Sequence, residues 1–338
     1  MKHAPHFKTF LDNEVNLNET RLTQLKKRVE AVYKALGDDD RIGDLVLGKI
    51  RQGSWPQRTI IKPKAGKDFD ADFLLKLDWN EDWADNPSKY PNAIYGALGR
   101  NSTYAEMHYG RGCHSVFLEY ARDSEDIGCH LDIVAHVVDP YGRKLIVNRD
   151  DDEFEEINPE GFTDWMKQRD DAAKGNLRTV IRLMKYYKAR KGSFNGVRSM
   201  ILTTLLGEQV NEFRASIDPA FYADIPTTLL RLVTSLDEYL QLHETMPSLS
   251  DPGGMGTFDH RWTQETYANF RTRMHAAAAA ITAAYEEEDD FDRSVALWQD
   301  VFGEAFKPTP PATSSAKFAG AAATGALGSF GGRSGKSG

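Results

Sequence analysis

A cluster of aspartates lies just ahead of an apolar run that is typical of a buried β-strand. Asp68, Asp70 and Asp72 alternate with other residues, and residues 73–75 follow as Phe-Leu-Leu. Because side chains two apart on a strand share a face, Asp70 and Asp72 are expected to project together, with Asp68 in line behind them. Carboxylates at such short distances raise each other's pKa unless a cation lies between them. Magnesium commonly binds one or two carboxylates together with substrate phosphates, so the pattern predicts a nucleotidyl-transfer site.

A small turn precedes the aspartates and has the composition of a phosphate cradle. Gln52, Gly53 and Ser54 are consecutive, and a Gly-Ser turn lets backbone N–H groups approach phosphates closely. The alternative is that the acidic cluster is a solvated loop and the Gly-Ser pair is incidental. The apolar run directly after Asp72 favours the catalytic interpretation, because a solvated charge cluster would be out of place there.

A third carboxylate, Asp132, stands alone in the β-branched, apolar stretch 129–138. An unpaired aspartate in such a strand would suffer a large desolvation cost. Metal binding beside Asp70 and Asp72 would remove that cost. A buried hydrogen bond or ion pair would do so equally well, and the residues alone leave both interpretations open.

The two cysteines each precede a histidine: Cys113 with His114, and Cys129 with His130. A zinc site built from the four residues is one interpretation. Zinc ligands usually come from loops or knuckles with short spacings. These pairs lie on two expected strands, where adjacent residues face opposite ways, so we expect free, buried cysteines.

The elements that must position these residues follow from the periodicity of the chain. Residues 16–19 resemble a helix start with an acidic residue at N3, and helical spacing follows in Leu22, Leu25, Val29, Val32 and Leu36. Residues 115–120 and 127–138 are expected to form neighbouring strands joined by a polar turn. Residues 78–111 read mainly as loop and short helix. The acidic run 150–156 marks a boundary.

Beyond that boundary the periodicity is helical. Residues 177–187 predict a helix with one apolar face and a basic stripe of Arg178, Arg182 and Lys185. An amphipathic helix needs a polar face, so the stripe by itself does not indicate a binding role. Further helices are expected at 200–210, 227–242, 262–285 and 294–306. From Pro308 the composition changes to Pro, Ala, Gly, Ser and Thr, which cannot bury enough surface to order a chain, so residues 308–338 predict a flexible tail.

Together these residues resemble the catalytic core of the Pol-β-like nucleotidyltransferases. Within that superfamily the chain is similar to the cGAS/DncV-like enzymes, the CD-NTases, which are cyclic-oligonucleotide synthases of bacterial antiphage (CBASS) defence. The resemblance rests on Gly53-Ser54, the Asp70/Asp72 pair and Asp132, and it extends through segments 130–133, 177–187 and 296–306. It covers most of residues 7–307.

The resemblance implies an α+β fold. A nucleotidyltransferase core with a mixed sheet and a long N-terminal helix would span residues 1–160. A helical domain would span 161–307, followed by the tail 308–338, with the active site in the cleft between core and helical domain.

The family pattern implies that Asp70, Asp72 and Asp132 bind two Mg²⁺ ions, for which Mn²⁺ could substitute. Gln52, Gly53 and Ser54 would bind nucleotide phosphates, helped by Lys185 and Ser199. Asp68/Asp70 is an alternative register of the pair. Asp70/Asp72 is preferred because the family's pair runs directly into the apolar strand.

The implied activity is synthesis of a cyclic di- or trinucleotide second messenger from ATP and other NTPs, with release of pyrophosphate. The product would activate a downstream effector. Some family members are conjugated through a C-terminal glycine by a ubiquitin-transfer-like (E1/E2-like) partner, which makes Gly338 a candidate conjugation site. An ordinary disordered end is the alternative. Same-fold rivals modify an RNA, a protein or a small molecule, and a rival of another class is a catalytically silent nucleotide-binding scaffold.

Composition excludes several other classes. The 338 residues carry a net charge of −8 with no basic block, so a long nucleic-acid-binding surface is not expected. The first residues lack the apolar core of a signal peptide, and the alanine run 276–280 is too short to span a bilayer, so we expect a cytoplasmic protein without membrane contact. Gly335-Lys336-Ser337 suggests a P-loop, but Phe330 stands where the pattern needs glycine.

Overall fold

A computed structural model describes residues 1–64, 66–287 and 289–309. The strands are β1 (Val46–Gln52), β2 (Asp68–Leu77), β3 (His108–Arg111), β4 (Ser115–Tyr120), β5 (Gly128–Val138), β6 (Lys144–Asn148) and β7 (Glu153–Glu156). The helices are α1 (Ala4–Phe10), α2 (Glu19–Gly37), α3 (Lys89–Arg100), α4 (Pro159–Ala172), α5 (Leu177–Lys191), α6 (Ser199–Glu208), α7 (Glu212–Ile217), α8 (Ile225–Leu242), α9 (Gln264–Glu286) and α10 (Phe291–Phe302). Short helical turns complete the set: η1 (Leu11–Val15), η2 (Gly43–Leu45), η3 (Glu81–Trp83) and η4 (Asp259–Arg261).

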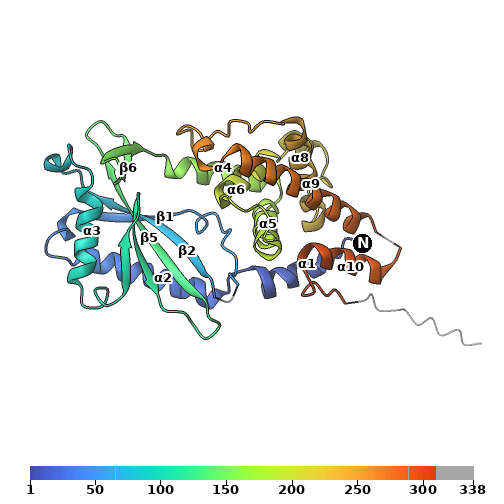
Figure 1. Cartoon of the computed structure of the whole chain (residues 1–338), viewed down its shortest axis with the longest axis horizontal. Coiled ribbons are helices and arrows are strands. Elements are labelled where there is room, and N and C mark those ends of the chain that lie inside the picture. The colour runs from blue at the N-terminus through green and yellow to red at the C-terminus, as the bar shows by residue number, and fades with distance from the viewer. Residues whose placement is uncertain (65, 288, 310–338) are drawn as a thin grey trace, which may run out of the picture. The chain divides into compact units, whose positions relative to one another are not determined.

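The seven strands form one mixed sheet in the order β1-β2-β5-β4-β3, with β6 pairing β5 and β7 (Figure 1). β2 and β5 run parallel, and the other pairs are antiparallel. Parallel neighbours need a long crossover, which here contains α3, β3 and β4. The expected α+β fold with a mixed sheet is confirmed.

Strand β2 separates its apolar and acidic residues by alternation. Phe69, Ala71, Phe73 and Leu75 are buried in a core that they share with α2 and α3. The acidic residues at 68, 70 and 72 therefore point to the opposite face. α2 begins where the sequence predicts, with the Asn18 side chain accepting a hydrogen bond from the backbone N–H of Arg21.

A second hydrophobic core is built from the helices α4 to α10 and from the first fifteen residues. Phe7 and Phe10 are buried in it together with Trp298, Phe302 and Phe306. The ring centroids of Phe7 and Trp298 lie 5.1 Å apart, edge to face. Residues 4–15 thus pack with the helical part of the chain, although the sequence assigns them to the catalytic half. Local pattern identifies an apolar helix face but not the partner that covers it.

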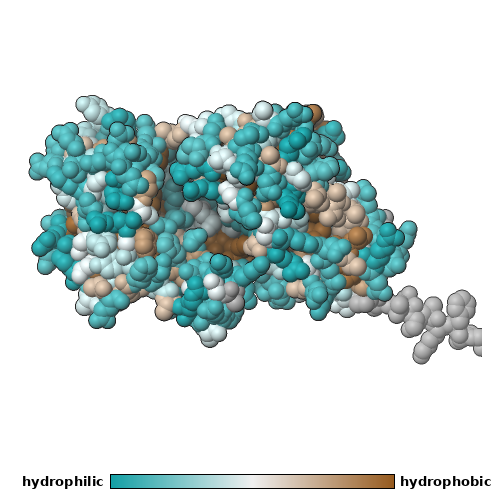
Figure 2. Space-filling view, in the orientation of Figure 1, coloured by the Kyte–Doolittle hydropathy of each residue, from teal (hydrophilic) through white to brown (hydrophobic). Residues whose placement is uncertain are grey.

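The surface is hollowed between the parts built on these two cores, close to α5, and hydrophobic residues are visible deep in the hollow (Figure 2). The structure adds two strands to these expectations. Residues 78–111 contain β3 besides the helix α3, and the acidic run 150–156 contains β7, the last strand before the helices begin at α4. β7 pairs with β6, whose apolar residues supply the packing that the acidic sequence lacks.

Both cysteines are free. Cys129 is buried as expected, whereas Cys113 is only part-buried, with its Sγ 3.1 Å from Oδ1 of Asn148. No helix in the described part of the chain is long and apolar enough to cross a membrane. The tail from residue 310, the P-loop-like triplet 335–337 and Gly338 lie outside the described residues.

Candidate active site

Three aspartates meet at the parallel pair β2–β5. In the register of the two strands, Asp72 is opposite Asp132 and Asp70 is opposite His130. Paired residues in neighbouring strands share a face, and the next residues along, Phe73 and Ile133, are buried on the other side. Two segments about sixty residues apart in the sequence therefore present their carboxylates side by side.

In this group, burial and the mutual repulsion of the carboxylates outweigh the nearby positive charges of His130 and Lys185. Burial, reinforced by the charges of Asp132 and Asp70, raises the pKa of Asp72 to about 7. Burial also raises the pKa of Asp70, and the carboxylates of Asp132 and Asp68 add to the effect. The hydrogen bond to Asp132 raises the pKa of His130. Such mutually raised values are typical of sites where a cation binds.

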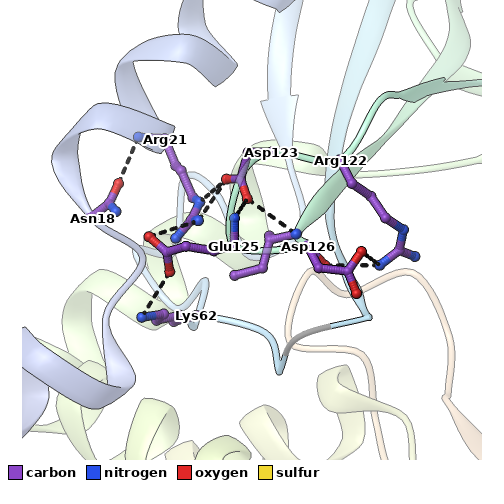
Figure 3. Close-up of polar contacts among 8 residues, drawn as sticks. Asn18, Arg21, Lys62, Arg122, Asp123, Glu125 and Asp126 are labelled. Carbon is purple, nitrogen blue, oxygen red and sulfur yellow. Dashed lines mark hydrogen bonds and ion pairs between the residues drawn. The ribbon is translucent and has the colours of Figure 1, made fainter.

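The third aspartate of β2 has its own partner. The carboxylate of Asp68 lies 2.8 Å from Nη2 of Arg122. Nη1 of the same arginine contacts Asp126 in the β4–β5 turn (Figure 3). In the β2–β5 register Asp68 is opposite Gly128, two residues before His130. This placement favours Asp70/Asp72 over Asp68/Asp70 as the pair that works with Asp132.

The donor set suits Mg²⁺, which prefers oxygen ligands from carboxylates. Among residues 1–64, 66–287 and 289–309, no three His, Cys, Asp or Glu side chains already converge on one metal position. Unscreened carboxylates repel, so a wider spacing is expected of them without a cation. A further oxygen is at hand: Gln52 is opposite Asp72 across β1–β2, and its buried Oε1 has no hydrogen-bond partner within the described chain.

Gly53 begins the turn that follows β1 and lies against the carboxylate of Asp72. Its φ of +66° lies in the left-handed region that favours glycine. A Cβ at this position would also overlap Oδ2 of Asp72. The Gly-Ser turn therefore lies directly against the carboxylates. Ser54 is part-buried, and its carbonyl accepts a hydrogen bond from the N–H of Thr59, closing the turn.

Lys185 of α5 reaches this turn from the helical half of the molecule. Its buried ammonium donates hydrogen bonds to the carbonyl (3.0 Å) and the hydroxyl (3.1 Å) of Thr59. Burial and the neighbouring Lys188 together lower the pKa of Lys185 to about 8, against the opposing effect of the Asp72 charge. A second link joins the turn to α4, where Gln57 donates to the hydroxyl of Thr163 at 2.9 Å.

Ser199 is exposed at the first position of α6. The preceding loop is attached to α5, because the ammonium of Lys188 donates to the carbonyl of Val197. The structure thus brings Lys185 to the Gly-Ser turn directly, and Ser199 lies near the same helix through Lys188.

Two neighbours of Asp132 escaped the sequence reasoning. The hydroxyl of Ser115 donates to Oδ1 of Asp132 at 2.5 Å, and Nε2 of His130 lies 3.5 Å from Oδ2. A signal for His130 existed, since it precedes Asp132 by two residues on one strand. Ser115 carried none, because its proximity depends on the antiparallel pairing of β4 with β5.

Comparison with known proteins places this geometry in a family. The model of the "Second Messenger Oligonucleotide or Dinucleotide Synthetase domain" (SMODS) matches residues 1–170, half of the chain and all of β1 to β7. The chain is also 25% identical over 320 residues to a protein named cyclic AMP-AMP-AMP synthase from Acinetobacter sp. (strain ATCC 27244 / 9458). That alignment covers 93% of this chain and 88% of the relative.

Solved structures share the fold at low sequence identity. CdnC from E. coli MS115-1, solved with ATP, superposes with a TM-score of 0.67 at 18% identity, covering 90% of this chain and 98% of that one. DncV cyclic AMP-GMP synthase from Vibrio cholerae, in complex with nonhydrolyzable GTP, gives 0.69 at 14% identity, covering 89% and 96%. The chain therefore belongs to the SMODS family of CD-NTases, the nucleotidyltransferases that synthesise cyclic oligonucleotides.

Proposed function

We propose that this enzyme uses Mg²⁺ to join NTPs, ATP among them, into a cyclic di- or trinucleotide through the site formed by Asp70, Asp72 and Asp132. The observation that supports the proposal most strongly is the parallel register that sets Asp72 opposite Asp132, with Gly53 against Asp72. A binding module has no need of three carboxylates in this arrangement, since their repulsion destabilises the fold without a cation.

Asp70, Asp72 and Asp132 would hold Mg²⁺, two ions in the arrangement inferred from the family, with Mn²⁺ as a substitute. Bound there, the metal would lower the pKa of an attacking ribose hydroxyl and stabilise the negative charge on the leaving pyrophosphate. Because the pKa of Asp72 is raised to about 7 and that of Asp70 is raised as well, protons compete with the cation for these carboxylates as the pH falls.

The turn at Gly53 and Ser54 would bind the donor triphosphate through backbone N–H groups, because glycine allows the chain to approach closely. Gln52 stands at the start of this turn, opposite Asp72, and would add a side-chain contact to the phosphates. Lys185 would add positive charge behind the turn, where it already holds Thr59. Ser199 would contact phosphate from the first turn of α6.

The Acinetobacter relative is named a cyclic AMP-AMP-AMP synthase, so ATP is the first substrate to test and a cyclic trinucleotide the first product to seek. In CBASS defence the product would activate an effector. A partner protein is also part of the proposal: an E1/E2-like enzyme would conjugate the chain through Gly338.

One assay separates this function from its rivals. The purified full chain is incubated with Mg²⁺ and labelled NTPs, and the products are then treated with phosphatase. Label in a phosphatase-resistant oligonucleotide supports cyclisation. Label on an RNA, a protein or a small molecule supports a transferase without cyclisation, and no turnover supports a silent scaffold. Asp132→Asn is the control, expected to abolish synthesis.

The register of the acidic pair has its own test. Asp68→Asn is expected to keep most activity, because Asp68 is paired with Arg122, whereas Asp70→Asn and Asp72→Asn lose it. An inactive Asp68→Asn together with an active Asp72→Asn would show that the pair is Asp68/Asp70.

A further inference from the structure

We propose that Ser115 and His130 are positioning residues that hold the two carboxylate oxygens of Asp132 in place for metal binding. The inference rests on the proposed function, in which Asp132 is a metal ligand. It concerns what keeps this aspartate in position, since the strands fix only its backbone and leave its side-chain torsions free.

Ser115 contacts one oxygen. It is the first residue of β4, opposite Val134 in the antiparallel register, so its side chain leans along the strand toward Asp132. Its hydroxyl donates to Oδ1 at 2.5 Å, and both side chains are part-buried. Hydrogen bonds to an ionised acceptor are short and roughly twice as strong as neutral ones. Ser115 therefore fixes the rotation of the carboxylate.

His130 contacts the other oxygen. Its Nε2 lies 3.5 Å from Oδ2 of Asp132, and its Nδ1 lies 3.6 Å from Oε1 of Glu119 on β4. The ring of Phe117 stacks on the imidazole with centroids 5.1 Å apart and an interplanar angle of 24°. Glu119 is held in turn by His108 of β3 at 2.8 Å. The imidazole is thus clamped between two carboxylates and an aromatic face.

The repulsion between the aspartates explains why such support matters. Asp72 faces Asp132 directly, and without restraint the two carboxylates would rotate apart. Ser115 of β4 contacts Oδ1 of Asp132 and His130 of β5 contacts Oδ2, so both oxygens are restrained against this rotation. Partners of metal ligands in other proteins typically contribute about 10–100-fold to metal affinity or activity.

The test uses the full chain and two readouts of metal dependence. One is the rise in melting temperature on titration with Mn²⁺ alone. The other is the Mg²⁺ concentration that gives half-maximal synthesis at saturating ATP. The variants are Ser115→Ala, Ser115→Thr as the conservative replacement, and His130→Phe, which keeps a ring against Phe117 but lacks both nitrogens. Asp132→Asn is the reference for a lost ligand.

Matched controls remove a serine hydroxyl or a histidine side chain at positions outside the proposed site. Ser216→Ala deletes an exposed hydroxyl on α7 that donates to the carbonyl of Phe213, and His275→Phe breaks an exposed histidine–carboxylate pair with Asp237. Far-UV circular dichroism establishes that each variant is folded. Ser115→Thr and His130→Phe serve as independent arms if Ser115→Ala does not fold.

We expect Ser115→Ala and His130→Phe each to require about ten-fold more metal in both readouts, with synthesis partly restored at saturating metal. Ser115→Thr and the controls should resemble the parent. If Asp132→Asn loses metal binding while Ser115→Ala and His130→Phe do not, the inference is wrong and the proposed function stands. If Asp132→Asn binds metal as the parent does, the proposed function itself fails.

Discussion

At the scale of single residues, Gly53 and Asp72 constrain one another. Gly53 has a φ of +66°, and its Cα faces the carboxylate so closely that no side chain fits between them. The glycine of the proposed phosphate-binding turn thus also borders the carboxylate site. Position 53 serves two requirements at once, conformation and close approach.

Gly53→Ala is expected to lower kcat by roughly 100-fold or more, because the added Cβ must displace the Asp72 carboxylate, and shifts of about 1 Å at a reacting centre have effects of that size. Steady-state synthesis of labelled product measures the loss. Gly142→Ala is the control, since Gly142 has a φ of +84° but open space where a Cβ would lie. Both variants carry the left-handed strain of about 1–2 kcal/mol, and only Gly53→Ala should lose activity.

Asp72 makes the stability of the metal-free protein depend on pH. Its pKa rises from 3.8 to about 7 on folding, so between these values the folded state binds a proton that the unfolded state does not. The free energy of unfolding therefore falls as the pH rises from about 4 to about 7. Asp72→Asn removes this charge, so its Tm in EDTA should exceed the parent's at pH 8 by a few degrees.

The comparison is repeated at pH 4.5, where the parent's Asp72 is already protonated and the difference should disappear. A Tm gain of the same size at both pH values would mean that charge is not its cause. Addition of Mg²⁺ at pH 8 is expected to stabilise the parent and leave Asp72→Asn unchanged, which separates ligand binding from simple relief of repulsion.

At the scale of elements, the β4–β5 turn ties three segments together. Arg21 at the start of α2 donates to Oδ2 of Asp123 from Nε (2.8 Å) and Nη2 (2.6 Å), and Nη2 lies 3.3 Å from Glu125 (Figure 3). Glu125 also pairs with Lys62 at 3.3 Å, in the segment between the Gly-Ser turn and β2. The network thus positions the entry to the catalytic strand.

Arg21→Leu is expected to lower the free energy of unfolding by about 1–3 kcal/mol, because the buried guanidinium donates two hydrogen bonds to Asp123 and forms an ion pair with Glu125. Urea denaturation measures the change. Lys167→Met is the control: it breaks a pair with Asp171 in which both side chains are exposed, and should alter stability by less than about 0.5 kcal/mol. Equal small losses in both variants would show that the network does not stabilise the turn.

At the scale of the whole molecule, the start and the end of the folded unit meet. Phe306 is buried against Phe7 (5.1 Å) and Phe10 (5.3 Å), and the N–H of Lys307 donates to Nε2 of His6 at 3.0 Å. Because these contacts join α1 to the segment after α10, the second core depends on residues from both ends of the unit Met1–Pro308.

Removal of residues 309–338 is therefore expected to leave both the Tm and cyclic-oligonucleotide synthesis unchanged. Phe306→Ala in the full chain should instead cost about 3–5 kcal/mol, the range for deleting a buried aromatic ring. Thermal melts and the labelled-NTP assay compare the two. Loss of synthesis on truncation, with Tm retained, would assign the tail a part in the reaction.

Much of the fold and of the candidate site could be predicted from the sequence alone. Alternation along β2 separates Phe69, Phe73 and the aspartates by face, and the period of α2 identifies its buried side, because both are short-range consequences of backbone geometry. The link between Asp70/Asp72 and Asp132 came from family resemblance, since no periodicity connects residues sixty positions apart.

Other features were decided only by tertiary structure. The parallel register that sets Asp72 opposite Asp132, the contact of Ser115 with Asp132 and the reach of Lys185 to Thr59 each join distant segments. Which strands pair, and in which register, depends on how whole apolar faces pack, and no local pattern encodes that choice. The sequence alone thus determined the carboxylates and the face they share, while packing decided which of them meet and what holds them there.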